Sequence, residues 1–217
     1  MMETSRRYVL LDRDGVINRQ VVNGYVTRWK DFSFLPGVLS ALRLLREHDY
    51  TVLVVSNQSC VGRGLLSWEE LQAITRRMVL EVALAGGAIA KVYYCPHAPA
   101  DLCNCRKPEP GLLQKAMEEH QAWPAQIYMI GDSASDLEAA ARAGCRSLLI
   151  RRGTFLRHGN GNGGEANVVS DLLEAVDLIL RHDTPTLEET LRRDWPQMRS
   201  GWHTAGANSV PPKRNLA

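Results

Sequence analysis

Short apolar segments alternate with amphipathic segments along most of the chain, and this alternation limits the folds that the sequence can adopt. Five apolar segments are rich in β-branched or aromatic residues at consecutive positions: Tyr8–Leu11, Thr51–Val55, Lys91–Tyr94, Ile127–Ile130 and Ser147–Ile150. Such runs are typical of parallel strands that are covered on both faces. Strands that alternate with helices in this way predict right-handed crossovers and an α/β fold with a doubly wound parallel sheet.

The segments between these strands carry helix signals. Two of them repeat apolar residues at helical spacing, namely Val38, Leu42 and Leu45 in the first and Leu71, Ile74, Met78 and Val82 in the second. Ser67 and Glu70 form the sequence pattern of a capping box, which predicts that the second helix begins there. Gly144 predicts the end of a later helix, because glycine readily adopts the left-handed conformation that terminates helices.

The last third of the chain is less regular. Residues 159–164 are rich in Gly and Asn and predict a surface loop, Val168–Val169 predicts an edge strand, and Asp171–Leu180 predicts a packing helix. From about Asp183 the chain is rich in Pro and polar residues. We therefore expect one domain over residues 1–182 and a C-terminal extension over 183–217 that is largely irregular or disordered.

Composition narrows the class of protein. Hydrophobic residues make up 45% and charged residues 23% of the 217 residues, which is the balance of a globular protein. The formal net charge of +2 gives no strong field for nucleic acid or a membrane surface. No apolar run approaches the roughly 18 residues of a membrane span, and the first residues do not resemble a signal peptide. We expect a cytoplasmic, monomeric protein without nucleic-acid or membrane partners.

Polar residues follow the predicted strands at the edge where parallel sheets bind ligands. Asp12 and Asp14 come directly after the first strand, Ser56 ends the second, Lys107 lies after the third and Asp132 follows the fourth. The carboxyl ends of parallel strands meet at one edge of the sheet. Any one of these residues could be a turn former or a helix cap. Together, three acids, a hydroxyl and a cation predict a catalytic site.

This set suits phosphoryl transfer. A carboxylate that attacks an anionic phosphate ester needs a cation to neutralise charge and donors around the phosphoryl oxygens. Asp12 and Asp132 can hold Mg²⁺, which prefers oxygen ligands, and Asp12 can attack phosphorus to form an aspartyl-phosphate. Asp14 can protonate the leaving oxygen and later deprotonate water, while Ser56 and Lys107 bind the phosphoryl oxygens.

A second cluster of metal ligands lies between the third strand and Lys107. Cys95, His97, Cys103 and Cys105 supply three thiols and one imidazole, a tetrahedral set suited to structural Zn²⁺. A loop with incidental free cysteines is the alternative. The odd number of cysteines does not indicate a secreted disulfide framework. Because no ligand position is left open, we expect a structural zinc-binding loop that fixes the direction of the cations following it.

The motifs resemble those of the haloacid dehalogenase (HAD) superfamily. The resemblance rests on Asp12–Asn18, Ser56–Gln58, Lys107-Pro108, and Gly131-Asp132 with Asp136. It implies a Rossmann-like fold with little or no cap domain and an aspartyl-phosphate intermediate on Asp12. It also implies Mg²⁺ bound by Asp12, Asp132 and the backbone carbonyl of Asp14, with Asp136 in a supporting role.

Within the superfamily, the chain resembles the branch that dephosphorylates heptose 1,7-bisphosphates and histidinol phosphate, which carries a zinc loop of the same form. The resemblance implies carbohydrate metabolism that supplies lipopolysaccharide precursors, with a heptose 1,7-bisphosphate preferred at its 7-phosphate and histidinol phosphate as the alternative. It implies these substrate contacts: Asn23, Gly24, Tyr25, Asn57, Gln58, Ser59, Arg106 and Ser133. Cys60 departs from the glycine usual in the heptose enzymes, at the border of the expected pocket.

A different class of protein also fits the residue types. A phospho-receiver signalling module likewise uses an acid cluster, Mg²⁺, a hydroxyl and a lysine on a doubly wound sheet. Receivers place the phosphorylated aspartate on the third strand, whereas Asp12 follows the first. Asp14 also supplies an acid–base group that would shorten a phosphorylated state. An enzyme acting on nucleic-acid ends is less consistent with the sequence, which lacks a basic aromatic groove.

Overall fold

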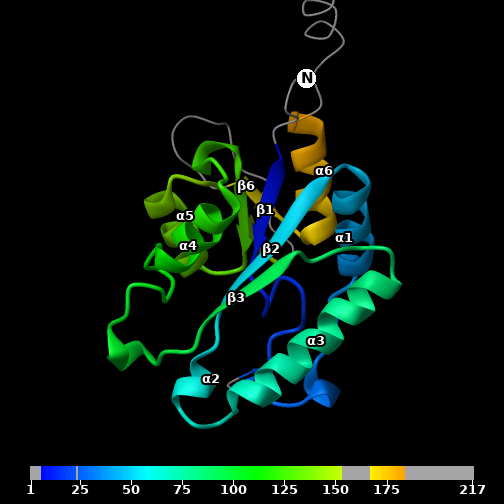
Figure 1. Cartoon of the computed structure of the whole chain (residues 1–217). Coiled ribbons are helices and arrows are strands. Elements are labelled where there is room, and N and C mark those ends of the chain that lie inside the picture. Colours follow the sequence, from blue (N-terminus) through cyan, green and yellow to red (C-terminus); the bar gives the residue numbers. More distant parts are fainter. Residues whose placement is uncertain (1–5, 23, 153–166, 184–217) are drawn as a thin grey trace, which may run out of the picture. The chain divides into compact units, whose positions relative to one another are not determined.

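A six-stranded parallel sheet forms the centre of the computed structural model, which describes residues 6–22, 24–152 and 167–183 (Figure 1). The strands are β1 (Arg7–Leu11), β2 (Tyr50–Asn57), β3 (Lys91–Cys95), β4 (Tyr128–Gly131), β5 (Arg146–Ile150) and β6 (Asn167–Val169). Their order in the sheet is β3-β2-β1-β4-β5-β6, and each neighbouring pair is parallel. This is the doubly wound parallel sheet that the sequence predicted.

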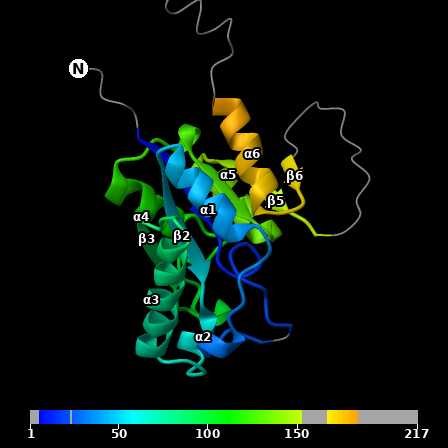
Figure 2. The ribbon, with the colours of Figure 1, turned by 90° about the vertical axis from the view of Figure 1, so that its right-hand side faces the viewer.

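Helices cover both faces of the sheet. Figures 1 and 2 show α4 and α5 on one face and α1 on the other. The α-helices are α1 (Val38–Glu47), α2 (Ser59–Gly62), α3 (Trp68–Leu84), α4 (Gly111–His120), α5 (Ala134–Ala143) and α6 (Leu172–Asp183), with 3-10 turns η1 (Trp29–Asp31), η2 (Pro99–Asp101) and η3 (Pro124–Gln126). In the described residues, only η1 lies between β1 and α1 and only α2 between β2 and α3, so the fold has little or no cap domain.

The strands form where hydrophobic residues are buried at consecutive positions. Leu10 of β1 is fully buried and pairs with Leu53 of β2 on one side and Met129 of β4 on the other. Both faces of these strands are covered, which explains why the sequence shows continuous apolar runs here instead of alternation. The predicted strands are confirmed with ends displaced by one or two residues; Ser56, for example, lies inside β2 and not at its end.

Local sequence signals set several helix ends. The backbone N–H of Glu70 donates to the Ser67 hydroxyl at 3.1 Å, and the Ser67 N–H donates to the Glu70 carboxylate at 2.9 Å, so the predicted capping box is confirmed. Gly144 ends α5 with φ of 77°, also as predicted. The sequence reasoning did not predict α4, whose buried residues are Leu112, Leu113, Ala116 and Met117.

The chain divides into two units, Met1–Leu178 and Ile179–Ala217, and the division falls within α6. The first unit contains the whole sheet. Of the second, the structure describes only the last residues of α6, to Asp183. The Gly-rich segment 159–164 and the predicted extension beyond Asp183 lie outside the described residues, so the boundary predicted after residue 182 stays a prediction. No helix in the described part of the chain combines the length and hydropathy needed to cross a membrane.

Candidate active site

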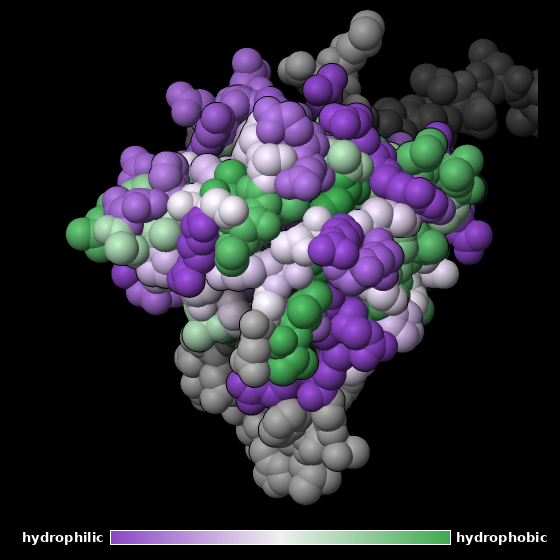
Figure 3. Space-filling model, turned by 90° about the horizontal axis from the view of Figure 1, so that it is seen from below, coloured by the Kyte–Doolittle hydropathy of each residue, from purple (hydrophilic) through white to green (hydrophobic). Residues whose placement is uncertain are grey.

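A cleft of about 260 Å³ lies at the carboxyl ends of the strands. Ten residues that the sequence analysis singled out line it: Asp12, Asp14, Gly24, Tyr25, Ser56, Asn57, Lys107, Asp132, Ser133 and Asp136. Figure 3 looks onto the end of the molecule where α2 follows β2, and hydrophilic and hydrophobic side chains alternate across this face. Residues from four separate segments thus meet in one place, as expected for the carboxyl edge of a parallel sheet.

Lys107 is the buried cation of the cleft. Its side-chain ammonium lies 2.9 Å from Asp12 Oδ1 and 2.5 Å from Asp136 Oδ1, and it donates to the Val55 carbonyl at 2.9 Å. The residue is only 3% exposed. Burial alone would lower the pKa of Lys107, but Asp12 and Asp136 outweigh it and raise that pKa above its ordinary value. Lys107 is therefore held as a cation between two carboxylates.

The negative charge of Asp12, Asp132 and Asp136 exceeds the positive charge of Lys107, which lines the same cleft. Oxygen atoms of Asp12, Asp132 and Asp136 lie within 4.8 Å of one another. Burial, followed by the charges of Asp12 and Asp136, raises the pKa of Asp132 to about 6. Burial also raises the pKa of Asp12, although Lys107 opposes the shift. A divalent cation would relieve this repulsion, and oxygen donors are the ligands that Mg²⁺ prefers.

Gly15 provides the space beside this cluster. Its φ is +91°, and a Cβ atom built on it would lie 1.8 Å from Asp132 Oδ2. Any larger residue would both strain the turn and displace Asp132. The turn after Asp14 thus lets the backbone approach the Asp132 carboxylate closely. This closeness suits a cation bound by both the backbone of the turn and Asp132.

Four hydrogen bonds hold the carboxylate of Asp14. Asn18 Nδ2 donates to Oδ1 at 2.8 Å and Gln58 Nε2 donates to Oδ2 at 2.6 Å, while Arg13 Nη2 lies 3.1 and 2.9 Å from the two oxygens. Arg13 is 1% exposed and also donates to Gln58 Oε1 at 3.1 Å. Each oxygen of Asp14 therefore has two donors, which fix the direction of this carboxylate at the wall of the cleft.

Other predicted substrate contacts are engaged with neighbouring loops. Asn57 Nδ2 donates to the Lys107 carbonyl at 3.0 Å, and the Lys107 N–H donates to Asn57 Oδ1 at 3.1 Å. The hydroxyls of Tyr25 and Ser59 lie 3.1 Å apart. Arg106 donates to the His97 carbonyl at 3.4 Å. The side chains of Ser59, Arg106 and Gln58 are outside the set that lines the cleft. Asn23 lies outside the described residues.

The four predicted zinc ligands form a cluster. Cys95 Sγ lies 3.6 Å from Cys103 Sγ and 3.3 Å from Cys105 Sγ, and the latter two are 3.5 Å apart. His97 Nδ1 lies 3.6 Å from Cys95 Sγ and 3.3 Å from Cys105 Sγ. Disulfide sulfurs would be about 2.05 Å apart. Four ligands at about 2.1–2.3 Å from a central zinc would be separated by about 3.5–3.8 Å, so the cluster has nearly the required size.

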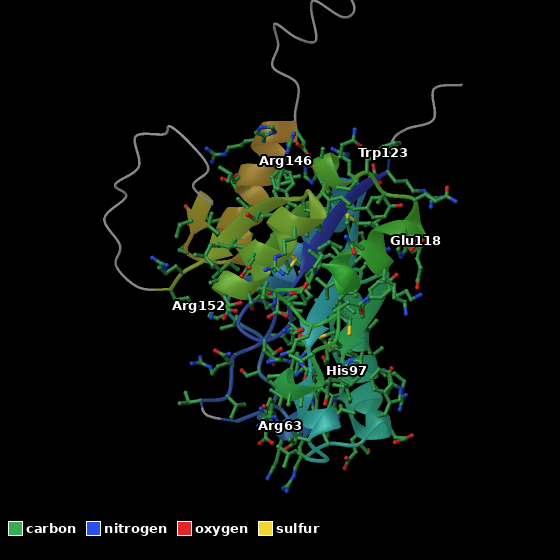
Figure 4. All side chains as sticks on the ribbon, turned by 90° about the vertical axis from the view of Figure 1, so that its left-hand side faces the viewer. Arg63, His97, Glu118, Trp123, Arg146 and Arg152 are labelled. Carbon is green, nitrogen blue, oxygen red and sulfur yellow. The ribbon has the colours of Figure 1, made fainter. Side chains whose placement is uncertain are left out.

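The surroundings of the cluster also suit a metal. Burial would raise the pKa of Cys103, but hydrogen bonds from Cys105 and Cys95 outweigh it and lower that pKa to about 7. Burial raises the pKa of Cys95 and of Cys105. Cys103 is thus the thiol that ionises most readily, and a bound Zn²⁺ would favour the thiolate form of the other two. Cys95 is the last residue of β3, so one ligand sits on the sheet and not on the irregular loop expected for all four. Figure 4 shows His97 toward the same end of the molecule as Arg63, away from Trp123 and Arg146.

Comparisons with known proteins identify the family. A family profile described as HAD-hydrolase-like matches residues 104–175. The heptose-1,7-bisphosphate 7-phosphatase of Mycobacterium tuberculosis, named for the α-anomer, is 40% identical over 180 residues, covering 80% of this chain and 91% of that protein. The β-anomer 7-phosphatase of Bordetella bronchiseptica is 39% identical over 179 residues, covering 81% of this chain and 98% of that protein. This chain belongs to the HAD-like hydrolases.

Solved structures agree with this assignment. The crystal structure of the D,D-heptose 1,7-bisphosphate phosphatase from B. bronchiseptica, complexed with magnesium and phosphate, is 34% identical with a TM-score of 0.73, covering 81% of this chain and 99% of that one. The enzyme from Burkholderia thailandensis is 31% identical with a TM-score of 0.59, covering 80% of this chain and 98% of that one. The chain is thus a HAD-like phosphatase, and a phospho-receiver module is not favoured.

The structure also places residues at this HAD-like site that the sequence reasoning missed. Gln20, Val21, Val26 and Ser135 line the cleft. Arg152 donates a hydrogen bond to the Gly15 carbonyl from the end of β5. A signal for Arg152 was present, because it follows a predicted strand just as Asp132 does. Nothing in the sequence distinguished the others from ordinary loop and helix residues.

Proposed function

We propose that this chain is a magnesium-dependent phosphatase that removes the 7-phosphate from D-glycero-D-manno-heptose 1,7-bisphosphate. The observation that carries the proposal is that Asp12, Lys107 and Asp132 line one cleft, in a chain 33–40% identical to proteins named for this activity. Histidinol phosphate is the alternative substrate from the same branch of the superfamily. None of the relatives named above is a histidinol-phosphate phosphatase.

In the proposed mechanism Asp12 is the nucleophile. An oxygen of Asp12 attacks phosphorus, and the bond between phosphorus and the sugar oxygen breaks. Asp14, protonated in the substrate complex in place of one of its donors, gives that proton to the departing sugar oxygen. Water then attacks the aspartyl-phosphate, its proton passes to Asp14, and inorganic phosphate leaves with Asp12 restored. The contact between Lys107 and Asp12 Oδ1 orients the nucleophile, and Ser56 of β2 donates to the phosphoryl oxygens.

Mg²⁺ would be held by Asp12, Asp132 and the backbone carbonyl of Asp14. When bound, it would neutralise the negative charge of the carboxylates and of the transferring phosphoryl group. Asp136 supports this arrangement indirectly, because it pairs with Lys107 at 2.5 Å and leaves Asp12 and Asp132 available for the cation. The relative solved with magnesium and phosphate supports the assignment.

We propose Zn²⁺ as a structural metal in the cluster of Cys95, His97, Cys103 and Cys105. The four ligand atoms already approach tetrahedral spacing, and all four positions would be filled by protein. Arg106 follows the last ligand directly and donates to the His97 carbonyl. The metal would therefore hold Arg106 and the catalytic lysine after it in place.

The proposed selectivity rests on the end of the substrate remote from the reacting phosphate. A bisphosphate offers a second anion there, whereas histidinol phosphate offers an amine and an imidazole. Arg106 would attract the anion, since its planar guanidinium suits a phosphate. Its present contact with the His97 carbonyl, at 3.4 Å, is long enough to be exchanged for a stronger one. Asn23, Gly24, Tyr25, Asn57, Gln58, Ser59 and Ser133 remain the other proposed contacts or supports of contacts.

A phosphate-release assay tests this function. The purified full chain is supplied with Mg²⁺ and equal concentrations of the α- and β-anomers of the heptose bisphosphate, histidinol phosphate and phenyl phosphate. We expect the highest kcat/KM for a heptose bisphosphate, with phosphorus NMR showing that the 1-phosphate remains. Faster hydrolysis of histidinol phosphate would overturn the heptose assignment but not the phosphatase mechanism. A cytoplasmic, monomeric enzyme is also proposed, and size-exclusion chromatography with light scattering tests the monomer.

A further inference from the structure

Two polar side chains that line the cleft, Tyr25 and Asn57, are already hydrogen-bonded within the protein. The hydroxyl of Tyr25 pairs with Ser59, and the amide of Asn57 pairs with backbone atoms of Lys107. In the Tyr25–Ser59 pair either hydroxyl can be the donor, so the polarity that this pair offers a substrate is not fixed. Ser135 also lines the cleft, from the first turn of α5, and its hydrogen-bond partner in the described residues is the hydroxyl of Ser133, whose own partner is known.

The direction of the hydrogen bonds around Ser135 can be deduced. Asp136 forms an ion pair with Lys107, so it is a carboxylate and can only accept. Ser133 Oγ lies 2.6 Å from Asp136 Oδ2 and must donate its only hydroxyl proton there. Ser135 Oγ lies 2.9 Å from Ser133 Oγ, so Ser135 must donate in this pair. The proton of Ser135 is therefore used inside the protein, and only its lone pairs remain for the cleft.

We propose that Ser135 is a specificity-determining residue that accepts a hydrogen bond from a sugar hydroxyl of the substrate. The inference rests on the proposed function and adds to it the direction of one hydrogen bond between the substrate and the protein. A polyol phosphate supplies a hydroxyl that can donate to Ser135. A substrate group that can only accept, such as fluorine or a carbonyl oxygen, would face the lone pairs of Ser135 and gain nothing there.

The first test removes the hydroxyl. Ser135→Ala places a good helix former in α5, and Ser135→Thr keeps the hydroxyl. Ser40→Ala is the matched control, an exposed serine of α1 outside the cleft. For each protein, kcat/KM is measured for the heptose bisphosphate, mannose 6-phosphate and phenyl phosphate, which has no sugar hydroxyl. We expect Ser135→Ala to lower the sugar-to-phenyl ratio by about 2- to 10-fold, the worth of one neutral hydrogen bond.

The control and the conservative variant should leave that ratio within about 2-fold of the wild type. An unchanged ratio in Ser135→Ala overturns the role of Ser135. If the wild type hydrolyses mannose 6-phosphate but not the heptose bisphosphate, the proposed function fails, and the ratio with mannose 6-phosphate still decides the role of Ser135. The two failures are thereby distinguished.

The second test addresses polarity. Sugar phosphates in which each hydroxyl in turn is replaced by hydrogen or by fluorine are compared with the parent sugar. Because Ser135 can only accept, the deoxy and deoxyfluoro analogues at the contacted position should lose kcat/KM equally in the wild type. Neither analogue should lose further kcat/KM when Ser135 is replaced by alanine. A fluoro analogue that keeps the parent rate where the deoxy analogue loses it would show that Ser135 donates, and would overturn the proposal.

Discussion

Replacing Lys107 by methionine should destabilise the protein strongly, because the lysine lies between two carboxylates. The ammonium is 2.9 Å from Asp12 and 2.5 Å from Asp136, and the side chain is 2% exposed. Removal of one partner from a buried ion pair typically costs about 3–5 kcal/mol, since the remaining charge stays desolvated. For a chain of this size, each kcal/mol lowers Tm by about 2–4 °C, so a loss of about 6–20 °C is expected.

The assay is thermal and urea unfolding of metal-free protein, with Lys91→Met as control. Lys91 pairs with Glu119 at the surface, where solvent screens the charges, and its loss should change stability little. The variant Lys107→Met should also recover stability as the pH is lowered. Burial already raises the pKa of Asp12, and Lys107 opposes that shift, so removing the cation raises this pKa further. An acid with a raised pKa in the folded state destabilises the folded protein progressively as pH rises.

Two results would refute this reasoning. One is a Lys107→Met protein as stable as the Lys91→Met control at neutral pH, which would mean that the carboxylates are not desolvated. The other is a double variant Lys107→Met/Asp136→Asn that loses as much stability as Lys107→Met alone. In the double variant Lys107→Met/Asp136→Asn one of the two unpaired charges is gone, so the loss should be smaller than in Lys107→Met alone.

Four further predictions concern activity and metals. Asp12→Asn should abolish phosphate release while the circular-dichroism spectrum and Tm stay near wild type; substantial activity after deamidation has been excluded would contradict the nucleophile assignment. Because the metal-free pKa of Asp132 is raised to about 6, protons should compete with Mg²⁺, and calorimetric titration should show weaker binding at pH 5.5 than at pH 7.5. Elemental analysis should find about one zinc per chain and less in Cys105→Ser, whereas no zinc in freshly purified, chelator-free protein would refute that site. Arg106→Ala should reduce the preference for heptose bisphosphate over histidinol phosphate by about one to two orders of magnitude in kcat/KM, and an unchanged preference would remove Arg106 from substrate selection.

Much of the fold and of the cleft could be predicted because each feature has a local signal. Continuous apolar runs identify parallel strands, and the sheet then determines which polar residues meet at its carboxyl edge. Asp12 and Asp132 could therefore be placed together without a structure. The cysteine and histidine spacing gave the metal cluster in the same way, although Cys95 proved to belong to β3.

The features that could not be predicted depend on tertiary packing. Arginine is normally exposed, so nothing in the sequence marked Arg13 as buried and bonded to Asp14. The sequence likewise did not show that the amide of Gln58, a proposed substrate contact, donates to Asp14. The role proposed for Ser135 could be inferred only from the structure, because the hydrogen bond from Ser133 to Asp136 determines the direction of the bond between Ser135 and Ser133. The partner of Gln58 is distant in the chain, and the bond of Ser135 depends on a second side chain. Arg13 is next to its partner in the sequence, but its burial is set by tertiary packing, which sequence spacing does not encode.

The position of β1 in the sheet has a consequence for the order in which the protein opens. β1 pairs with β2 on one side and β4 on the other, whereas β3 and β6 each have one neighbouring strand among the residues that the structure describes. Amide hydrogens in central strands generally exchange only in the most extensive unfolding events, whereas edges open in smaller and more frequent ones. The backbone N–H of Asp12 bonds to the Ile130 carbonyl at 3.0 Å and extends this central ladder. The residue proposed as nucleophile is thus attached to the part of the fold that opens last, and fluctuations at the edges can occur while Asp12 stays in register.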